Sequence, residues 1–165
     1  MLRFAHQTKP ERSLVNINDI IETTLAIRAS EMKTSNINVT TELSDLPLTS
    51  ADAGLLQQVF LNIILNAEQA MQEAHGKGNL TVKTERIDNV MRISFKDDGP
   101  GIAKANLEKI FNPFFTTKDP DRGTGLGLSI CYKIVKQHDG KIYAESELGK
   151  GVTFFIELPV VDEGE

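Results

Sequence analysis

The sequence predicts a two-layer α/β sandwich, in which helices cover one face of a mixed, mostly antiparallel sheet. One long segment, 52–74, has apolar residues at helical spacing. Segments of strand-forming residues come in adjacent pairs, 79–86 with 90–96 and 140–146 with 151–158, which favours hairpins over a doubly wound parallel sheet. A length of 165 residues suffices for one domain with a real core.

The first half of the chain predicts two helices separated by a strand. Asn18 or Asp19 is expected to cap the first helix, with Glu22 completing a capping box after Asp19. This helix continues to about residue 34. The alternating segment 37–41 predicts a strand, which ends before Pro47.

The segment 52–74 is the strongest predicted helix, and Gly76 and Gly78 are expected to end it. Its apolar residues form a stripe that should face the core. The stripe comprises Leu56, Val59, Phe60, Ile63, Ala67, Ala70 and Met71.

The second half predicts two hairpins with helices between them. Asp88-Asn89 forms the turn of the first hairpin, and Gly149-Lys-Gly151 that of the last. A short helix is expected at 103–110, a loop at 112–124 and a further helix at 125–138, which Asp139-Gly140 ends.

Composition and charge exclude several kinds of protein. The net charge of −5 is scattered and forms no basic stripe, so we expect no nucleic-acid partner. The chain contains neither an apolar run of about 20 residues nor a signal peptide, so we expect a cytoplasmic segment without direct membrane contact. The single cysteine, Cys131, cannot form an internal disulfide and is expected to be a small buried helix residue.

The long helix also carries a polar stripe, whose members lie three or four residues apart and share one face. Buried amides need partners, and a magnesium ion carrying nucleotide phosphates would be one, because Mg²⁺ prefers hard oxygen ligands. The alternative is a solvated polar face. The stripe comprises Gln58, Asn62, Asn66, Gln69 and Glu73.

The segment 97–101, Asp-Asp-Gly-Pro-Gly, predicts a turn at the end of a strand. Gly99 and Gly101 permit a close approach of the backbone to a flat ligand, and Pro100 stiffens the turn. A fixed carboxylate at Asp97 suits the exocyclic amine of adenine. An ordinary Asx turn between a strand and a helix is the alternative.

Aromatic residues and glycines flank the loop at 112–124. Phe111, Phe114 and Phe115 fit either a hydrophobic anchor or an aromatic hinge for a mobile lid. Lys118 and Arg122 are interpreted either as partners of the β- and γ-phosphates or as solvated charges. The run Gly123-Thr-Gly-Leu-Gly-Leu128 opens a helix, where backbone amides and the helix dipole favour an anion.

Taken together, the segments 62–67, 97–101, 110–118 and 123–128 resemble the N, G1, F and G2 boxes of sensor histidine kinases. These kinases share a superfamily with gyrase, mismatch-repair and heat-shock chaperone ATPases. The segments at 66–71 and 114–118 are most similar to the nitrogen-regulation branch. The resemblance implies a Bergerat-type ATP-binding fold, with a lid that closes over ATP and Mg²⁺.

The resemblance also implies residue roles. Asn66 is the expected Mg²⁺ ligand, and Asp97 the adenine contact. Asn62 and Lys118 are the expected catalytic residues; Asn62 stands where the ATPase relatives hold a glutamate base. Gln69 is an expected nucleotide-binding residue, at a position where many relatives carry a basic residue. The other expected nucleotide-binding residues are Gly99, Gly101, Ile102, Phe111, Thr117, Arg122, Gly123, Thr124, Gly125, Leu126, Gly127 and Leu128.

The resemblance implies further parts and partners. Residues 1–12 are expected to end a dimerising phosphoacceptor hairpin, residues 13–160 to form the catalytic domain, and residues 161–165 a tail. A histidine on that hairpin would receive the γ-phosphate, and a response regulator would follow. His6 is not expected to be the acceptor, and His75 and His138 fit helix ends. An ATP-hydrolysing switch and a non-enzymatic, anti-sigma-like binding module are the alternatives.

Overall fold

The computed structural model describes residues 9–113 and 127–161 and centres on a five-stranded sheet with the order β2-β4-β5-β7-β6. β2 pairs with β4 in parallel, and the other neighbours are antiparallel. The prediction of a mixed, mostly antiparallel sheet is therefore confirmed. The strands are β2 (Ile37–Leu43), β4 (Gly78–Ile87), β5 (Val90–Lys96), β6 (Lys141–Ser146) and β7 (Val152–Pro159).

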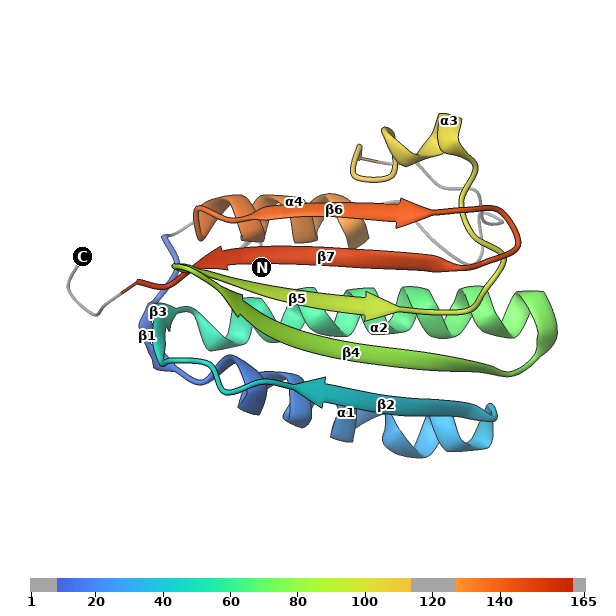
Figure 1. Cartoon of the computed structure of the whole chain (residues 1–165), viewed down its shortest axis with the longest axis horizontal. Helices are drawn as coiled ribbons and strands as arrows, with labels where there is room; N and C mark the ends of the chain where they lie inside the picture. Colours follow the sequence, from blue (N-terminus) through green and yellow to red (C-terminus); the bar gives the residue numbers. More distant parts are fainter. Residues whose placement is uncertain (1–8, 114–126, 162–165) are drawn as a thin grey trace, which may run out of the picture.

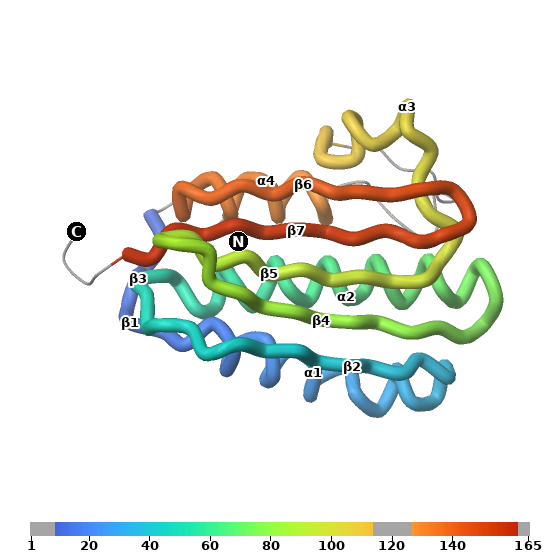
Figure 2. Tube along the Cα trace, viewed as in Figure 1, coloured from blue at the N-terminus to red at the C-terminus, as the bar shows by residue number. Residues whose placement is uncertain are grey.

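Three helices, α1 (Ile17–Thr34), α2 (Ala53–His75) and α4 (Gly127–Gln137), cover one face of this sheet (Figure 1). The short α3 (Lys104–Leu107) lies beyond β6. At the opposite end of the molecule, β1 (Ser13–Val15) pairs with β3 (Thr49–Ala51). The tube in Figure 2 shows that α2 leads into β4 at the same end where β5 leads toward α3. This end brings the polar stripe of α2 near the turn at 97–101.

The core lies between the helices and the sheet, and α2 runs through its centre. Leu56, Val59, Phe60 and Ile63 of α2 are fully buried. The ring of Phe60 lies 5.7 Å from that of Phe95 on β5. Burial on this scale stabilises a domain by roughly 25 cal/mol per Å² of apolar surface, so α2 is held mainly by packing. Of the predicted stripe, Ala70 is only partly buried.

The start of α1 differs from the prediction. Asn16, not Asn18 or Asp19, caps the helix, and its side chain accepts a hydrogen bond from the backbone N–H of Asp19. Asn18 instead donates to the carbonyl of Ser44 at 2.6 Å. The helix begins at Ile17, which is fully buried. Core packing therefore starts the helix earlier than the capping pattern indicated.

The boundaries of α2 and of the first hairpin are confirmed. Asp52 caps α2 by accepting from the backbone N–H of Leu55 at 3.0 Å, and Gly76 ends it in a left-handed conformation. The turn between β4 and β5 is at 88–89, with Asp88 at φ 57°. Local signals suffice here, because each end has a residue suited to its backbone.

Other elements differ in length or were not predicted. The helix expected at 103–110 is limited to α3, and turns follow it. β1 and β3 were not predicted, because three-residue strands carry no readable periodicity. They form where the chain returns beside the end of the sheet: the backbone N–H of Ser50 donates to the carbonyl of Val161 at 2.7 Å.

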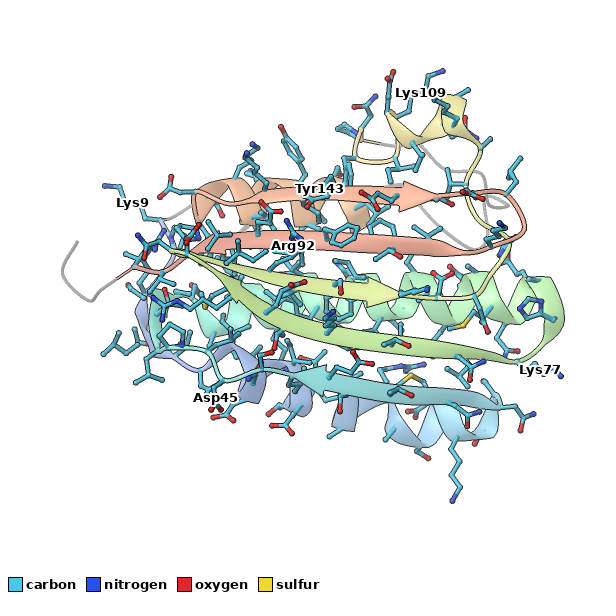
Figure 3. The ribbon with its side chains drawn as sticks, viewed as in Figure 1. Lys9, Asp45, Lys77, Arg92, Lys109 and Tyr143 are labelled. Atoms are coloured by element: carbon cyan, nitrogen blue, oxygen red, sulfur yellow. The ribbon has the colours of Figure 1, made fainter. Side chains whose placement is uncertain are left out.

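The face of the sheet away from the helices carries its own polar and aromatic cluster, and Figure 3 shows Arg92 and Tyr143 upon it. Glu157 accepts hydrogen bonds from both residues, at 3.1 Å from Arg92 and 2.5 Å from Tyr143. Phe155 stacks on Tyr143 with 5.0 Å between ring centroids. These side chains pack against one another on β5, β6 and β7, and none of the helices in the described part of the chain lies over them.

The segment before β1 is tied to the domain. Arg12 donates to the carbonyl of Ser50 at 3.0 Å and to that of Gln137 at 3.2 Å. The backbone N–H of Glu11 donates to Asp52 at 2.8 Å. Residues 9–12 form neither helix nor strand. Across residues 9–113 and 127–161, no helix has both the length and the apolar character that crossing a membrane requires.

Candidate functional site

A buried carboxylate marks the end of β5. Asp97 is only 2% exposed, and its Oδ1 accepts backbone hydrogen bonds from Gly99 at 2.9 Å and from Val152 at 3.2 Å. The backbone N–H of Asp97 donates in turn to the carbonyl of Val152 at 2.9 Å. Burial raises the pKa of the Asp97 carboxyl, although the two hydrogen bonds oppose that shift. The side chain therefore has one fixed orientation.

The turn after Asp97 packs too closely for larger residues. A Cβ on Gly99 would lie 3.3 Å from the Cβ of Ala70 on α2, so the turn rests directly on that helix. Gly101 has φ +82°, and a Cβ there would overlap the carbonyl oxygen of Glu147. Both glycines thus let the backbone pack closely against neighbouring segments, while their predicted close approach to a flat ligand stays a prediction.

The long helix approaches both glycine segments, through Asn62 of the polar stripe and through Ala70. Asn62 donates to the carbonyl of Gly127, at a long 3.5 Å, and Ala70 touches Gly99. These two contacts lie about 12 Å apart along the helix, from eight residues at 1.5 Å each. Asn66 stands midway between them on the same face, because four-residue steps align on a helix.

The exposure of the polar stripe varies along the helix. Asn62, Asn66 and Gln69 are partly buried, whereas Gln58 and Glu73 at the two ends of the stripe are exposed. The middle of the stripe therefore faces the two glycine segments, and its ends face solvent. An amide oxygen on a partly buried helix face is a suitable ligand for Mg²⁺, because most of the coordination shell of this ion is filled by water and phosphate oxygens.

The aromatic segment is anchored by its first residues. Ile110 is buried, and the ring of Phe111 lies 6.2 Å from that of Tyr132 and 6.4 Å from that of Phe154. The anchor interpretation therefore holds for Phe111. The remaining predicted residues lie outside the described part of the chain. They are Phe114, Phe115, Thr116, Thr117, Lys118, Arg122, Gly123, Thr124, Gly125 and Leu126.

The described end of the glycine run starts α4. Gly127 is exposed, and among the described residues no atom beyond its chain neighbours and its own helix backbone lies within 4 Å of the position that a Cβ on it would take. Leu128 packs against the core. Behind them Cys131 is fully buried, and burial raises the pKa of its thiol to about 12. The prediction of a buried helix cysteine is confirmed, and the thiol stays protonated at neutral pH.

Sequence analysis missed the support that the last hairpin gives to this site. A Cβ on Gly151 would overlap the carbonyl oxygen of Asp97. Ser146 accepts from the backbone N–H of Ile102 at 2.7 Å and donates to the carbonyl of Gly151 at 2.8 Å. The glycines at 149 and 151 indicated only a turn, and Ser146 gave no signal, because its partners are distant in sequence.

His138 and His75 both lie at helix ends, and their rings contact backbone groups of the protein. His138 is 3% exposed; its Nε2 accepts from the backbone N–H of Asp52 at 3.0 Å, and its Nδ1 lies 2.9 Å from the carbonyl of Ile134. Burial lowers the pKa of its imidazole. His75 is the last residue of α2, as expected, and it contacts the carbonyl of Asp98 at 3.0 Å.

Comparison with known families assigns the chain. Residues 51–162 match the family described as histidine kinase-, DNA gyrase B- and HSP90-like ATPases. The chain belongs to this family. The match includes α2, the Asp97 turn and the last hairpin, so the site built above lies within the shared ATPase domain. The predicted relationship to histidine kinases and their ATP-binding fold is confirmed.

Individual relatives of this ATPase domain are sensor kinases. It is 38% identical over 151 residues to sporulation kinase E of Bacillus subtilis, covering 91% of the chain and 20% of that protein. It is 34% identical to the catalytic domain of histidine kinase ThkA, covering 92% of the chain and 99% of that domain, with a TM-score of 0.81. The chain thus corresponds to a whole catalytic domain but to about a fifth of a curated relative.

Two further structures show relatives in complexes. Full-length ShkA in complex with AMPPNP is 27% identical, with a TM-score of 0.84, and the match covers 96% of this chain and 33% of that one. ThkA in complex with the response regulator TrrA is 31% identical, with a TM-score of 0.77, and the match covers 93% and 43%.

Proposed function

We propose that this catalytic domain binds ATP with Mg²⁺ and presents the γ-phosphate to a histidine on a separate helical hairpin. The observation that carries the proposal is the buried, singly oriented carboxylate of Asp97, in a turn whose Gly99 packs against Ala70 of α2. A relative of this domain has been solved in complex with AMPPNP, which supports nucleotide binding by this domain.

Recognition of adenine follows from the chemistry of Asp97. Its Oδ1 is occupied by two backbone amides, so Oδ2 is the oxygen that would accept from the exocyclic amine. Guanine carries a carbonyl oxygen at the equivalent edge, and two acceptors would repel each other. A buried group discriminates strongly in this way, because an unmatched polar atom loses its solvation without gaining a partner.

The phosphates would extend from this base along α2 toward the start of α4. Asn66 lies midway along that path and would supply one oxygen to Mg²⁺; the ion, when bound, would neutralise charge on the phosphates. Gly127 stands at the N-terminus of α4, where backbone N–H groups and the helix dipole favour anions. Lys118 and Arg122 are proposed to complete the charge neutralisation.

The chemistry of Asn62 favours transfer over hydrolysis. An amide cannot take a proton from an attacking water, so Asn62 does not offer a general base. Its Nδ2 is directed instead to the carbonyl of Gly127. Phosphoryl transfer needs mainly positioning and charge neutralisation, which this site offers without a base. A nucleophile on another domain would then receive the phosphoryl group.

The proposed partners are a phosphoacceptor hairpin, joined to this domain in the longer protein, and a response regulator. The complex of ThkA with TrrA supports the second partner. To test the function, the chain is titrated with ATP, with and without Mg²⁺, in a calorimeter. It is then mixed with labelled ATP and a purified hairpin domain of the same protein.

Micromolar to millimolar binding with Mg²⁺, little steady-state hydrolysis and label on the hairpin histidine are expected. Rapid phosphate release that Asn62→Ala abolishes would indicate an ATP-hydrolysing switch instead. Absence of both nucleotide binding and transfer would indicate a non-enzymatic binding module and would overturn the proposal.

A further inference from the structure

We propose that Asp98 is a positioning residue for adenine recognition, which fixes the direction of the neighbouring Asp97 carboxylate through Asn79 and His75. This inference rests on the proposed function, because it concerns how the Asp97 site is held. It assigns a task to the second carboxylate of the 97–101 turn, which would not itself touch the nucleotide.

The carboxylate of Asp98 makes a two-pronged contact with the start of β4. Its Oδ1 accepts from the backbone N–H of Asn79 at 3.0 Å, and its Oδ2 accepts from the side-chain Nδ2 of the same residue at 2.9 Å. Both prongs involve a charged acceptor, which makes such hydrogen bonds stronger than neutral ones. One residue thus joins the turn to β4 through both of its oxygens.

The end of α2 holds the backbone of the same turn. His75 places its Nε2 3.0 Å from the carbonyl oxygen of Asp98 and 4.0 Å from its Oδ1. Space is tight at this junction: a Cβ on Gly78 would lie 2.7 Å from Oδ1 of Asp98 and would overlap the sulfur of Met71. Asp98 therefore lies between the end of α2 and the start of β4, with its side chain 46% exposed.

The sheet order shows why this matters for Asp97. β5 lies between β4 and β7. Asp97 bonds to Val152 of β7, whereas Asp98 bonds to Asn79 of β4. Two consecutive carboxylates thus tie the end of β5 to both of its neighbours. Without the Asp98 contacts to β4, the turn that carries the Gly99 N–H would lose one attachment, and the hydrogen bond from Gly99 to Oδ1 of Asp97 would be held less firmly.

The electrostatics agree with this geometry. Burial would raise the pKa of Asp98, but the hydrogen bonds from Asn79 and the nearby His75 outweigh it and lower that pKa. Asp98 is therefore ionised at neutral pH and holds its partners as a carboxylate. Asp97, by contrast, has a raised pKa. The pKa values of the two neighbouring carboxyls are therefore shifted in opposite directions.

The test compares two substitutions of Asp98 with the full 165-residue chain as reference. Asp98→Ala removes both hydrogen bonds from Asn79. Asp98→Asn keeps one oxygen that can accept from the backbone N–H of Asn79, and its NH₂ group can donate to the side-chain oxygen of Asn79 once that amide has flipped. ATP and GTP affinities are measured for each by competition against a fluorescent nucleotide. Asp45→Ala serves as the matched control, because that exposed carboxylate lies away from the turn (Figure 3).

Asp98→Ala is expected to weaken ATP binding about fivefold or more and to lower the preference for ATP over GTP, because a loosened Asp97 discriminates less. Asp98→Asn should stay within about twofold of the wild type, and Asp45→Ala should have no effect. A merely structural role of Asp98 would weaken both nucleotides in parallel, and that result would overturn the inference. Unchanged ATP affinity in folded Asp98→Ala would also overturn it.

If thermal melting shows that Asp98→Ala does not fold, Asn79→Ala decides, because it removes only the Oδ2 prong. A reduced ATP-to-GTP preference in this variant supports the inference, and an unchanged preference overturns it. Failure of the proposed function and failure of the Asp98 inference give different results. Wild-type chain that binds no ATP removes the proposed function and this inference with it, whereas ATP binding that depends on Asp97 but not on Asp98 removes the inference alone.

Discussion

Replacing Asp97 with asparagine changes the atom proposed to bind adenine, Oδ2, while the backbone hydrogen bonds that hold the side chain in the fold can remain. Oδ1 of Asp97 accepts from the backbone N–H groups of Gly99 and Val152. An asparagine must keep its own oxygen there, because turning the amide would place a donor against two donors. Its NH₂ group then occupies the place of Oδ2, where it opposes the amine of adenine.

The magnitude follows from that geometry. A hydrogen bond to a charged group contributes about 1.5–3 kcal/mol, which corresponds to a roughly 10- to 150-fold loss of ATP affinity. The free energy of unfolding without nucleotide should not fall. Burial raises the pKa of Asp97 in the folded state, so its ionised form costs stability at neutral pH, and asparagine carries no such cost.

Calorimetric titration with ATP and Mg²⁺ and urea unfolding of the same samples provide the assay. Asp45→Asn, the same chemical change at an exposed position, is the control. Full ATP affinity in Asp97→Asn would refute the role of this carboxylate in recognition. Weaker binding accompanied by a large loss of unfolding free energy would refute the separation between recognition and stability.

Three further predictions concern the metal, the backbone and pH. Asn66→Ala should abolish most of the gain in ATP affinity that Mg²⁺ provides, measured by titrations with and without the ion; an intact gain would exclude Asn66 as ligand. Gly151→Ala should lower the free energy of unfolding, measured in urea titrations, by about 1–3 kcal/mol, because Gly151 has φ +86° and a Cβ on it would overlap the carbonyl oxygen of Asp97. Gly54→Ala is the control and should not lower the free energy of unfolding. Equal effects of the two substitutions would contradict the close approach of Gly151 to Asp97. Burial lowers the pKa of His138 below 6.5, so this residue contributes fully to the free energy of unfolding above pH 6.5, and its contribution falls as the pH decreases below that value, by at most about 1.4 kcal/mol per pH unit. His138→Gln should make the free energy of unfolding depend less on pH in this range. The same pH dependence in the variant and the wild type would contradict the prediction.

Elements with strong local signals could be predicted from the sequence. The boundaries of α2 agree within a residue, because Asp52 and Gly76 are suited to the two ends of a helix with a regular apolar stripe. The β4–β5 hairpin is equally local. The cap of α1 was wrong, since Asn18 resembles a cap in sequence but uses its side chain to reach Ser44.

In the candidate site too, residues within short motifs could be predicted from the sequence, whereas residues that act through distant contacts could not. The residues expected to touch the nucleotide lie in short motifs, so Asn66, Asp97 and Gly99 could be named from the sequence. Their supports could not, because Val152 and Asn79 reach the Asp97 turn only through strand pairing across the sheet. Single-residue contacts between distant segments leave no periodic signal. The assignment to the nitrogen-regulation branch stays a prediction.

The central claim is that the Asp97 turn and the polar face of α2 together bind a nucleotide, and amide-resolved NMR during a titration with ATP and Mg²⁺ tests it most directly. The backbone resonances of Gly99 and Val152 and the side-chain amide of Asn66 are predicted to shift together, with one common dissociation constant. Shifts confined to the opposite face of the sheet, around Arg92 and Tyr143, or no shifts at saturating ATP, would contradict the account.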